Sequence, residues 1–161
     1  MKKVTALVVC VLLVASLLTG CFGDTKEFSC QDLTMSVPFT MKDVSGQGEF
    51  YKFDFALDSA KIAIFGLREH FSILPDASSM TVREYAEMVI RANNHQAMAI
   101  ARSNEEYFYF TYEASTDEGT FEYLAGCYKG EDAFWLIQIA AKKADFDKET
   151  FLGYLDSVEI N

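Results

Sequence analysis

Three strand-like segments follow one another along the chain between residues 107 and 141, separated by two short polar turns. The first segment, residues 107–113, reads YFYFTYE, and the turns occupy residues 114–120 and 129–132. Aromatic residues favour pleated strands, and connections this short join antiparallel neighbours, because a parallel pair needs a long crossover. The sequence therefore predicts an antiparallel meander of residues 107–113, 121–128 and 133–141.

The remaining elements are predicted from periodicity and from helix caps. Alternating patterns predict strands at residues 33–37, before Pro38, and a hairpin of residues 51–57 and 60–67, with short strands at 28–30 and 97–101. Residues 71–80 are predicted to be a loop. Thr81 and Glu84 form a capping box that starts a helix ending near Asn93, and a second helix begins near Asp147. Helices separated by runs of strands predict an α+β fold, an antiparallel sheet with helices packed on it.

The N-terminus has the pattern of a secretory signal. Lys2 and Lys3 precede an apolar run over residues 4–18, followed by small residues. The sequence LTGC at residues 18–21 resembles the lipobox of bacterial lipoproteins, which implies cleavage before Cys21 and attachment of a diacylglycerol to its thiol. We therefore expect a signal peptide at 1–20, the lipidated Cys21 with a short tether at 21–27, and one domain at 28–161.

This processing implies a place for the protein. Acyl chains on Cys21 would hold it at the cell membrane on the extracytoplasmic face. Loss of Lys2 and Lys3 leaves 12 of the 14 basic residues against all 24 acidic residues, a formal charge of −12. A domain of this charge is expected to be repelled by anionic headgroups and is a poor ligand for nucleic acid, which needs clustered Lys and Arg.

Several segments together resemble the PsbP/Mog1-like family and its bacterial lipoprotein members. They are LTMSVPFTM, MTVREYAEMVIRANN, YFYFTYEA and DAFWLIQIAAKKADFDKETFLGYLDSVEI, which span residues 33–160. The resemblance implies an α/β/α sandwich that serves as a non-enzymatic binding or assembly module. It transfers no functional residue, because none of the matching features is catalytic.

No catalytic, metal or cofactor motif is recognisable in the chain. The two histidines, His70 and His95, show no metal-ligand spacing, and the acidic pairs at predicted turns lack the pattern of a calcium loop. We therefore expect a non-enzymatic protein without metal or cofactor that binds a protein or small ligand. The alternatives are an extracytoplasmic hydrolase that uses His70 or His95 with a carboxylate, and a structural or stress-related envelope protein.

Two further sets of residues are candidates for a site. Cys30 and Cys127 form either a structural disulfide, as an oxidising compartment permits, or two buried thiols. The aromatic residues are unusually numerous, with 14 Phe, 8 Tyr and 1 Trp. If helices cover both faces of the sheet, all these rings are core residues, which is the interpretation we favour; the alternative is that the two predicted helices leave part of one face open. An open face lined with aromatic side chains would suit a peptide, glycan or apolar ligand, and its candidate residues are Tyr107, Tyr109, Tyr123 and Trp135.

Overall fold

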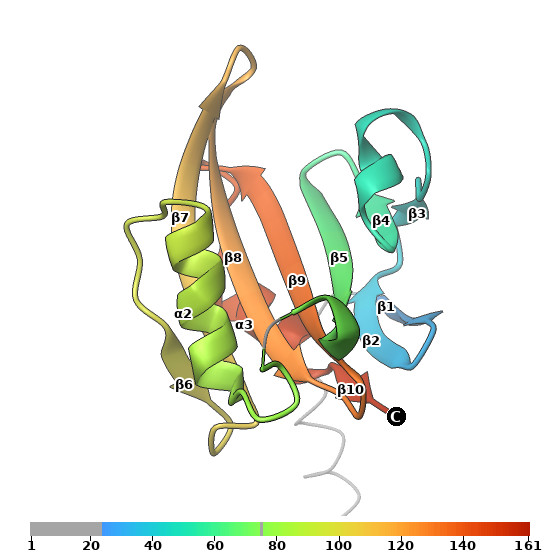
Figure 1. The fold of residues 1–161 in the computed structure, drawn as a ribbon. Helices are drawn as coiled ribbons and strands as arrows, with labels where there is room; N and C mark the ends of the chain where they lie inside the picture. The colour runs from blue at the N-terminus through green and yellow to red at the C-terminus, as the bar shows by residue number, and fades with distance from the viewer. Residues whose placement is uncertain (1–23, 75) are drawn as a thin grey trace, which may run out of the picture.

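The computed structural model describes residues 24–74 and 76–161 (Figure 1). The predicted signal peptide, the lipobox and Cys21 lie outside these residues. Within the described residues no helix is long and apolar enough to cross a membrane.

The described chain forms a large antiparallel sheet with the order β3-β4-β5-β9-β8-β7-β6. Its strands are β3 (Lys42–Asp43), β4 (Phe55–Asp58), β5 (Ile62–His70), β6 (Ile100–Arg102), β7 (Tyr107–Thr116), β8 (Gly119–Lys129) and β9 (Ala133–Lys142). A smaller antiparallel sheet with the order β1-β2-β10 contains β1 (Thr25–Cys30), β2 (Leu33–Pro38) and β10 (Glu159–Ile160). The predicted α+β class is confirmed.

The meander of β7, β8 and β9 forms the centre of the large sheet, as predicted. β7 and β8 are longer than expected, because their register runs to the pair Thr116 and Gly119 and leaves a two-residue turn. Gly119 adopts a positive φ of 123°, which a side chain would disfavour. The hairpin therefore extends beyond its neighbours, and its tip projects from the rest of the domain (Figure 1).

Two α-helices cover opposite faces of the large sheet (Figure 1). Helix α2 (Val82–Ala92) begins with the predicted capping box, in which Thr81 and Glu84 each bond the other's backbone N–H. Helix α3 (Lys148–Asp156) begins at its predicted cap, Asp147, which accepts a hydrogen bond from the backbone of Thr150. Both predicted helix starts are confirmed.

Alternation along the strands produces a separate core on each face. On one face α3 and the small sheet cover Trp135, Tyr107, Tyr109 and neighbouring aliphatic side chains. On the other face α2 covers Phe108, Phe110 and Phe134, with the Tyr85 ring stacked on Phe134 at 4.3 Å. The aromatic residues of the meander are therefore shared between two cores.

The structure differs from the sequence prediction in several segments, among them the short strand expected at 97–101, which the structure places at Ile100–Arg102. Residues 51 and 52 belong to a 3-10 helix, η1 (Gly48–Lys52), and the strand expected at 51–57 begins only at Phe55. The end of the expected tether is also wrong, because Thr25 pairs with Pro38 and β1 starts there. A short 3-10 helix, η2 (Phe71–Ile73), lies in the predicted loop.

A polar contact centred on Asp32 joins the two sheets. Its carboxylate, in the turn between β1 and β2, accepts hydrogen bonds from Arg68 Nε at 3.1 Å and from Trp135 Nε1 at 3.1 Å. Its backbone carbonyl accepts from the N–H of Asn161 at 2.8 Å. Partial burial acts to raise the pKa of Asp32, but the hydrogen bonds from Arg68 and Trp135 outweigh it and lower the pKa.

Candidate functional site

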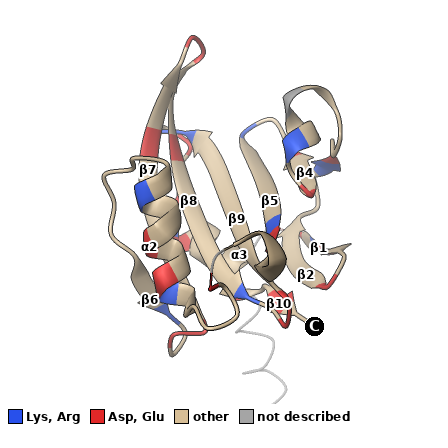
Figure 2. Cartoon of the chain, in the orientation of Figure 1, with Lys and Arg blue, Asp and Glu red and all other residues tan. Residues whose placement is uncertain are grey.

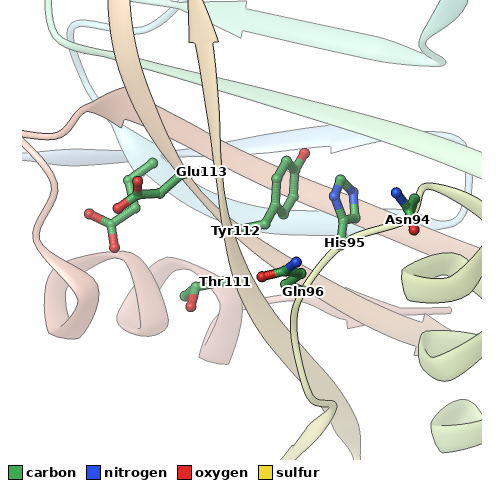
Figure 3. A pocket seen from close by; sticks show the side chains of 7 residues that line it. Asn94, His95, Gln96, Thr111, Tyr112 and Glu113 are labelled. Atoms are coloured by element: carbon green, nitrogen blue, oxygen red, sulfur yellow. The ribbon is translucent and has the colours of Figure 1, made fainter.

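A cavity of about 460 Å³ lies at the outer edge of β7, beside the segment that connects α2 to β6 (Figure 3). Its lining is mostly polar and comes from three parts of the chain. The connecting segment contributes one wall, β7 the other, and β8 a single carboxylate: the residues are Asn94, His95 and Gln96, then Thr111, Tyr112 and Glu113, then Glu122.

The cavity exists because β6 covers only the first residues of β7. The three residues of β6 pair with Tyr107, Phe108 and Tyr109, and no strand of the described chain pairs with residues 110–116 on that side. Asn94 turns the chain out of α2 with a φ of 54°. The connecting segment then passes along the α2 side of the sheet to β6, and its Ala97 and Ala99 pack against the core between α2 and the sheet. The cavity is the space between this segment and residues 111–113 of β7.

A row of stacked rings begins in the cavity and continues across the sheet. The His95 ring stacks on Tyr112 with centroids 3.8 Å apart, and Tyr112 stacks on Tyr123, its cross-strand partner, at 4.6 Å and 9°. The Tyr112 hydroxyl donates a hydrogen bond to Gln138 Oε1 at 2.5 Å. Burial lowers the pKa of His95 and raises that of Tyr112, so both rings are neutral at neutral pH.

The row continues on the same face of the sheet through two phenylalanines, the first of them on β5. Tyr123 lies 6.4 Å from the Phe65 ring, which in turn stacks on Phe53 at 4.9 Å. Tyr112, Tyr123 and Phe53 are only half-buried. Tyr112 packs against the core under α2, whereas Tyr123, Phe65 and Phe53 belong to a separate cluster with Ala56 and Ala140.

Acidic residues surround the open edge. Glu113 lies directly across from Glu122, and Glu113 accepts a hydrogen bond from Lys143 Nζ at 2.5 Å. This hydrogen bond and the nearby carboxylates raise the pKa of Lys143. With Asp117 and Glu118 in the turn, the hairpin carries more acidic than basic residues at this end (Figure 2).

The structure corrects three of the four residues predicted to form an aromatic binding face. Trp135 is completely buried, and Tyr107 and Tyr109 are also core residues, because α3 and the small sheet cover their face. Tyr123 lies on the opposite face, half-buried beside Tyr112. The structure does contain aromatic side chains that are only partly covered, but they are Tyr112 and Tyr123, with His95 stacked on Tyr112. They do not include Tyr107, Tyr109 or Trp135.

The two histidines lie in different surroundings. His70 is half-exposed: its Nε2 is hydrogen-bonded to Arg68 Nη1 at 2.5 Å, and its Nδ1 lies 3.5 Å from Asp132 Oδ2. His95 lines the cavity with Glu113 and Glu122, but its ring is stacked on Tyr112. Only His95 therefore belongs to the candidate site.

Cys30 and Cys127 are free thiols, so the alternative of a disulfide between them is not what the structure contains. Cys127 is fully buried in the core under α2, whereas Cys30 packs against the core of the opposite face. The sheet itself separates the two side chains. In residues 24–74 and 76–161 no group of three or more His, Cys, Asp or Glu side chains is arranged to hold a metal ion.

Sequence reasoning missed the cavity because it could not place the segment after α2. The sequence nevertheless contained a feature that indicates how β7 and β8 pair. A two-residue turn at Asp117 and Glu118, followed by Gly119, pairs Tyr112 with Tyr123 and Glu113 with Glu122. The assignment of residues 114–120 to a longer turn concealed these pairs.

Comparison with known proteins supports the fold. No protein-family model matches the sequence, and no curated protein matches it. Among solved structures, the cyanobacterial PsbP (CyanoP) of Synechocystis superposes with a TM-score of 0.57 at 13% identity, over 89% of this chain and 96% of that chain. A protein from Bacteroides thetaiotaomicron superposes with a TM-score of 0.56 at 11% identity, over 84% of this chain and 48% of that one. The domain therefore has a PsbP-like fold.

Proposed function

We propose that this protein is an extracytoplasmic lipoprotein, anchored through Cys21, whose PsbP-like domain is a non-enzymatic binding module. The cavity at the outer edge of β7 is its binding site. The observation that carries the proposal is this cavity, in which amide, carboxylate and aromatic groups converge beside strand residues 110–116, whose side away from β8 pairs with no strand of the described residues.

The histidine contacts favour binding over catalysis. A general base needs a ring nitrogen free to accept a proton from a bound substrate. In His70, Arg68 is hydrogen-bonded to Nε2, and Asp132 lies 3.5 Å from Nδ1. The His95 ring is stacked on Tyr112 and forms no hydrogen bond with Glu113 or Glu122, the carboxylates that would have to orient it as a base. We therefore favour a binding module over a hydrolase.

The anchor is proposed from the N-terminal sequence, and labelling tests it. In a bacterial host fed radioactive palmitate, we expect the full chain to be labelled and to sediment with membranes, whereas the Cys21→Ser variant is unlabelled. Cys30→Ser is the matched control and keeps the label, because it removes a thiol outside the lipobox. Equal labelling of Cys21→Ser would rule out this anchor.

Site-specific photocrosslinking tests the binding site. A photoreactive benzophenone amino acid replaces Gln96, an exposed residue of the cavity wall, or Glu131, an exposed residue of the turn at the other end of β8. After irradiation of intact cells, we expect a discrete adduct from position 96 and none from position 131. The same adducts at both positions would contradict a binding site at this edge.

A further inference from the structure

We propose that the ligand is an extended segment of a basic partner protein, which pairs with residues 110–116 of β7 and thereby adds a strand to the large sheet. This inference rests on the function proposed above and names the class of partner. Its starting point is the length of β7, of which β6 pairs with only the first three residues.

The backbone of β7 provides the first argument. In an antiparallel sheet alternate residues turn their N–H and C=O groups away from the neighbouring strand. The outward groups of residues 110–116 form no backbone hydrogen bond with any other described residue. Edge strands are usually kept from pairing by their shortness, by bulges or by covering segments. Here the strand pairs regularly with β8 to its end at Thr116, which leaves a regular template for an incoming strand.

The path of the connecting segment supplies the second argument. β6 runs antiparallel to β7 and ends its pairing at Ile100, opposite Tyr109. A partner strand beside residues 110–116 would continue the line of β6, in the position from which the connecting segment turns away. The cavity lies at this position, between Gln96 on the connecting segment and Thr111 on β7 (Figure 3). The site is therefore a gap in the sheet rather than a pocket for a compact molecule.

The neighbouring side chains predict the composition of the partner strand. Residues directly opposite each other on paired strands have adjacent side chains on the same face. A residue opposite Tyr112 would contact the stacked rings of Tyr112 and His95, and the next residue would lie beside Glu113 and Glu122. We expect an apolar or flat side chain at the first position and Lys or Arg at the second.

Charge also decides between a partner protein and a second copy of this chain. Antiparallel pairing of two β7 edges would place Glu113 of both copies close together, with the acidic turns at the two ends. Like charges opposite each other on paired strands destabilise a sheet. Lys143 already bonds Glu113, so it neutralises only one of the clustered carboxylates. The surface therefore fits a basic partner better than a copy of itself.

A displayed library of random peptides provides the probe. We select peptides on the full chain in detergent micelles and measure the affinity of a selected peptide by fluorescence anisotropy. We expect alternating basic and apolar residues, and slower amide hydrogen exchange over residues 110–116 when the peptide binds. Two versions of the peptide are compared, one N-methylated at its odd-numbered amides and one at its even-numbered amides. One version should bind at least tenfold more weakly and the other should bind almost unchanged, since only every second amide faces β7.

Charge reversal supplies the protein control. Glu122→Lys should weaken binding about tenfold or more, whereas Glu131→Lys, with the same charge change at the other end of β8, should alter it less than twofold. Urea unfolding of both variants checks that they are folded. Failure to select any peptide, equal loss from both N-methylation phases, or exchange protection outside β7 would each overturn the inference. A position-96 crosslink in cells together with any of these results would leave the binding module standing and reject only the added strand.

Discussion

Removal of the Asp32 carboxylate should destabilise the domain far more than removal of an ordinary surface carboxylate. Asp32→Ala leaves the indole N–H of completely buried Trp135 without its acceptor, and leaves Arg68, whose side chain is 11% exposed, with only Asp132 as an ionic partner. An orphaned buried donor costs about 1–3 kcal/mol, and a broken, largely buried ion pair adds to this. We expect a loss of about 3 kcal/mol in the free energy of unfolding.

Urea unfolding followed by tryptophan fluorescence measures this loss at the site itself, because Trp135 is the single tryptophan of the chain. With a urea dependence of about 2 kcal/mol per molar, the midpoint should fall by about 1.5 M. The matched control is Asp145→Ala, which removes an exposed ion pair with Lys61 and should cost less than about 1 kcal/mol. Equal midpoints for the two variants would refute the reasoning.

The pH dependence has a definite sign. Because the pKa of Asp32 is lower in the folded domain, its contribution is complete above the unfolded value of about 3.9 and disappears as the pH falls through the folded value. As the pH falls below about 4, the free energy of unfolding should therefore decrease less in Asp32→Ala than in the unmodified protein. The difference between the two proteins in urea midpoint measured across this range tests the assignment.

Three further predictions concern the helix cap, the cysteines and His95. Thr81→Ala should lower the free energy of unfolding by about 1 kcal/mol, measured in urea, because it removes the hydroxyl that accepts a hydrogen bond from the backbone N–H of Glu84 and donates one to the Glu84 carboxylate; an unchanged midpoint would argue against the cap. Iodoacetamide should alkylate Cys30 in the folded protein but Cys127 only after unfolding, as read by peptide mass, since burial raises the pKa of the Cys127 thiol; early modification of Cys127 would show that its core opens. His95 should titrate below about 6.5 by NMR, so its contribution to stability declines as the pH falls through that value; a higher pKa would contradict burial against Tyr112.

Local sequence signals predicted the elements whose boundaries depend on local chemistry. The Thr81 capping box and the Asp147 cap mark helix starts through short-range hydrogen bonds, and both were predicted correctly. The meander was predicted correctly because its strands are long and its turns short. Alternation failed at residues 51–54, where the packing of Phe50 and Phe53 against Phe65 favours η1 and an irregular continuation over a strand.

The candidate site was harder to predict, because it depends on which side of the sheet is covered. Tyr107, Tyr109 and Trp135 differ little from Tyr112 in their local sequence, yet the small sheet and α3 bury the first three. That covering layer contains β10, whose pairing with β2 joins residues more than 120 positions apart. Periodicity within one strand contains no information about such a contact.

The position of β2 between β1 and β10 also has a kinetic consequence. The first and last strands of the described chain flank the same strand, and the N–H of Asn161 bonds the carbonyl of Asp32. The small sheet can therefore close only after β10 has been synthesised, and contacts so distant in sequence slow folding. We therefore expect the pairing of β10 with β2 to be among the last steps of folding.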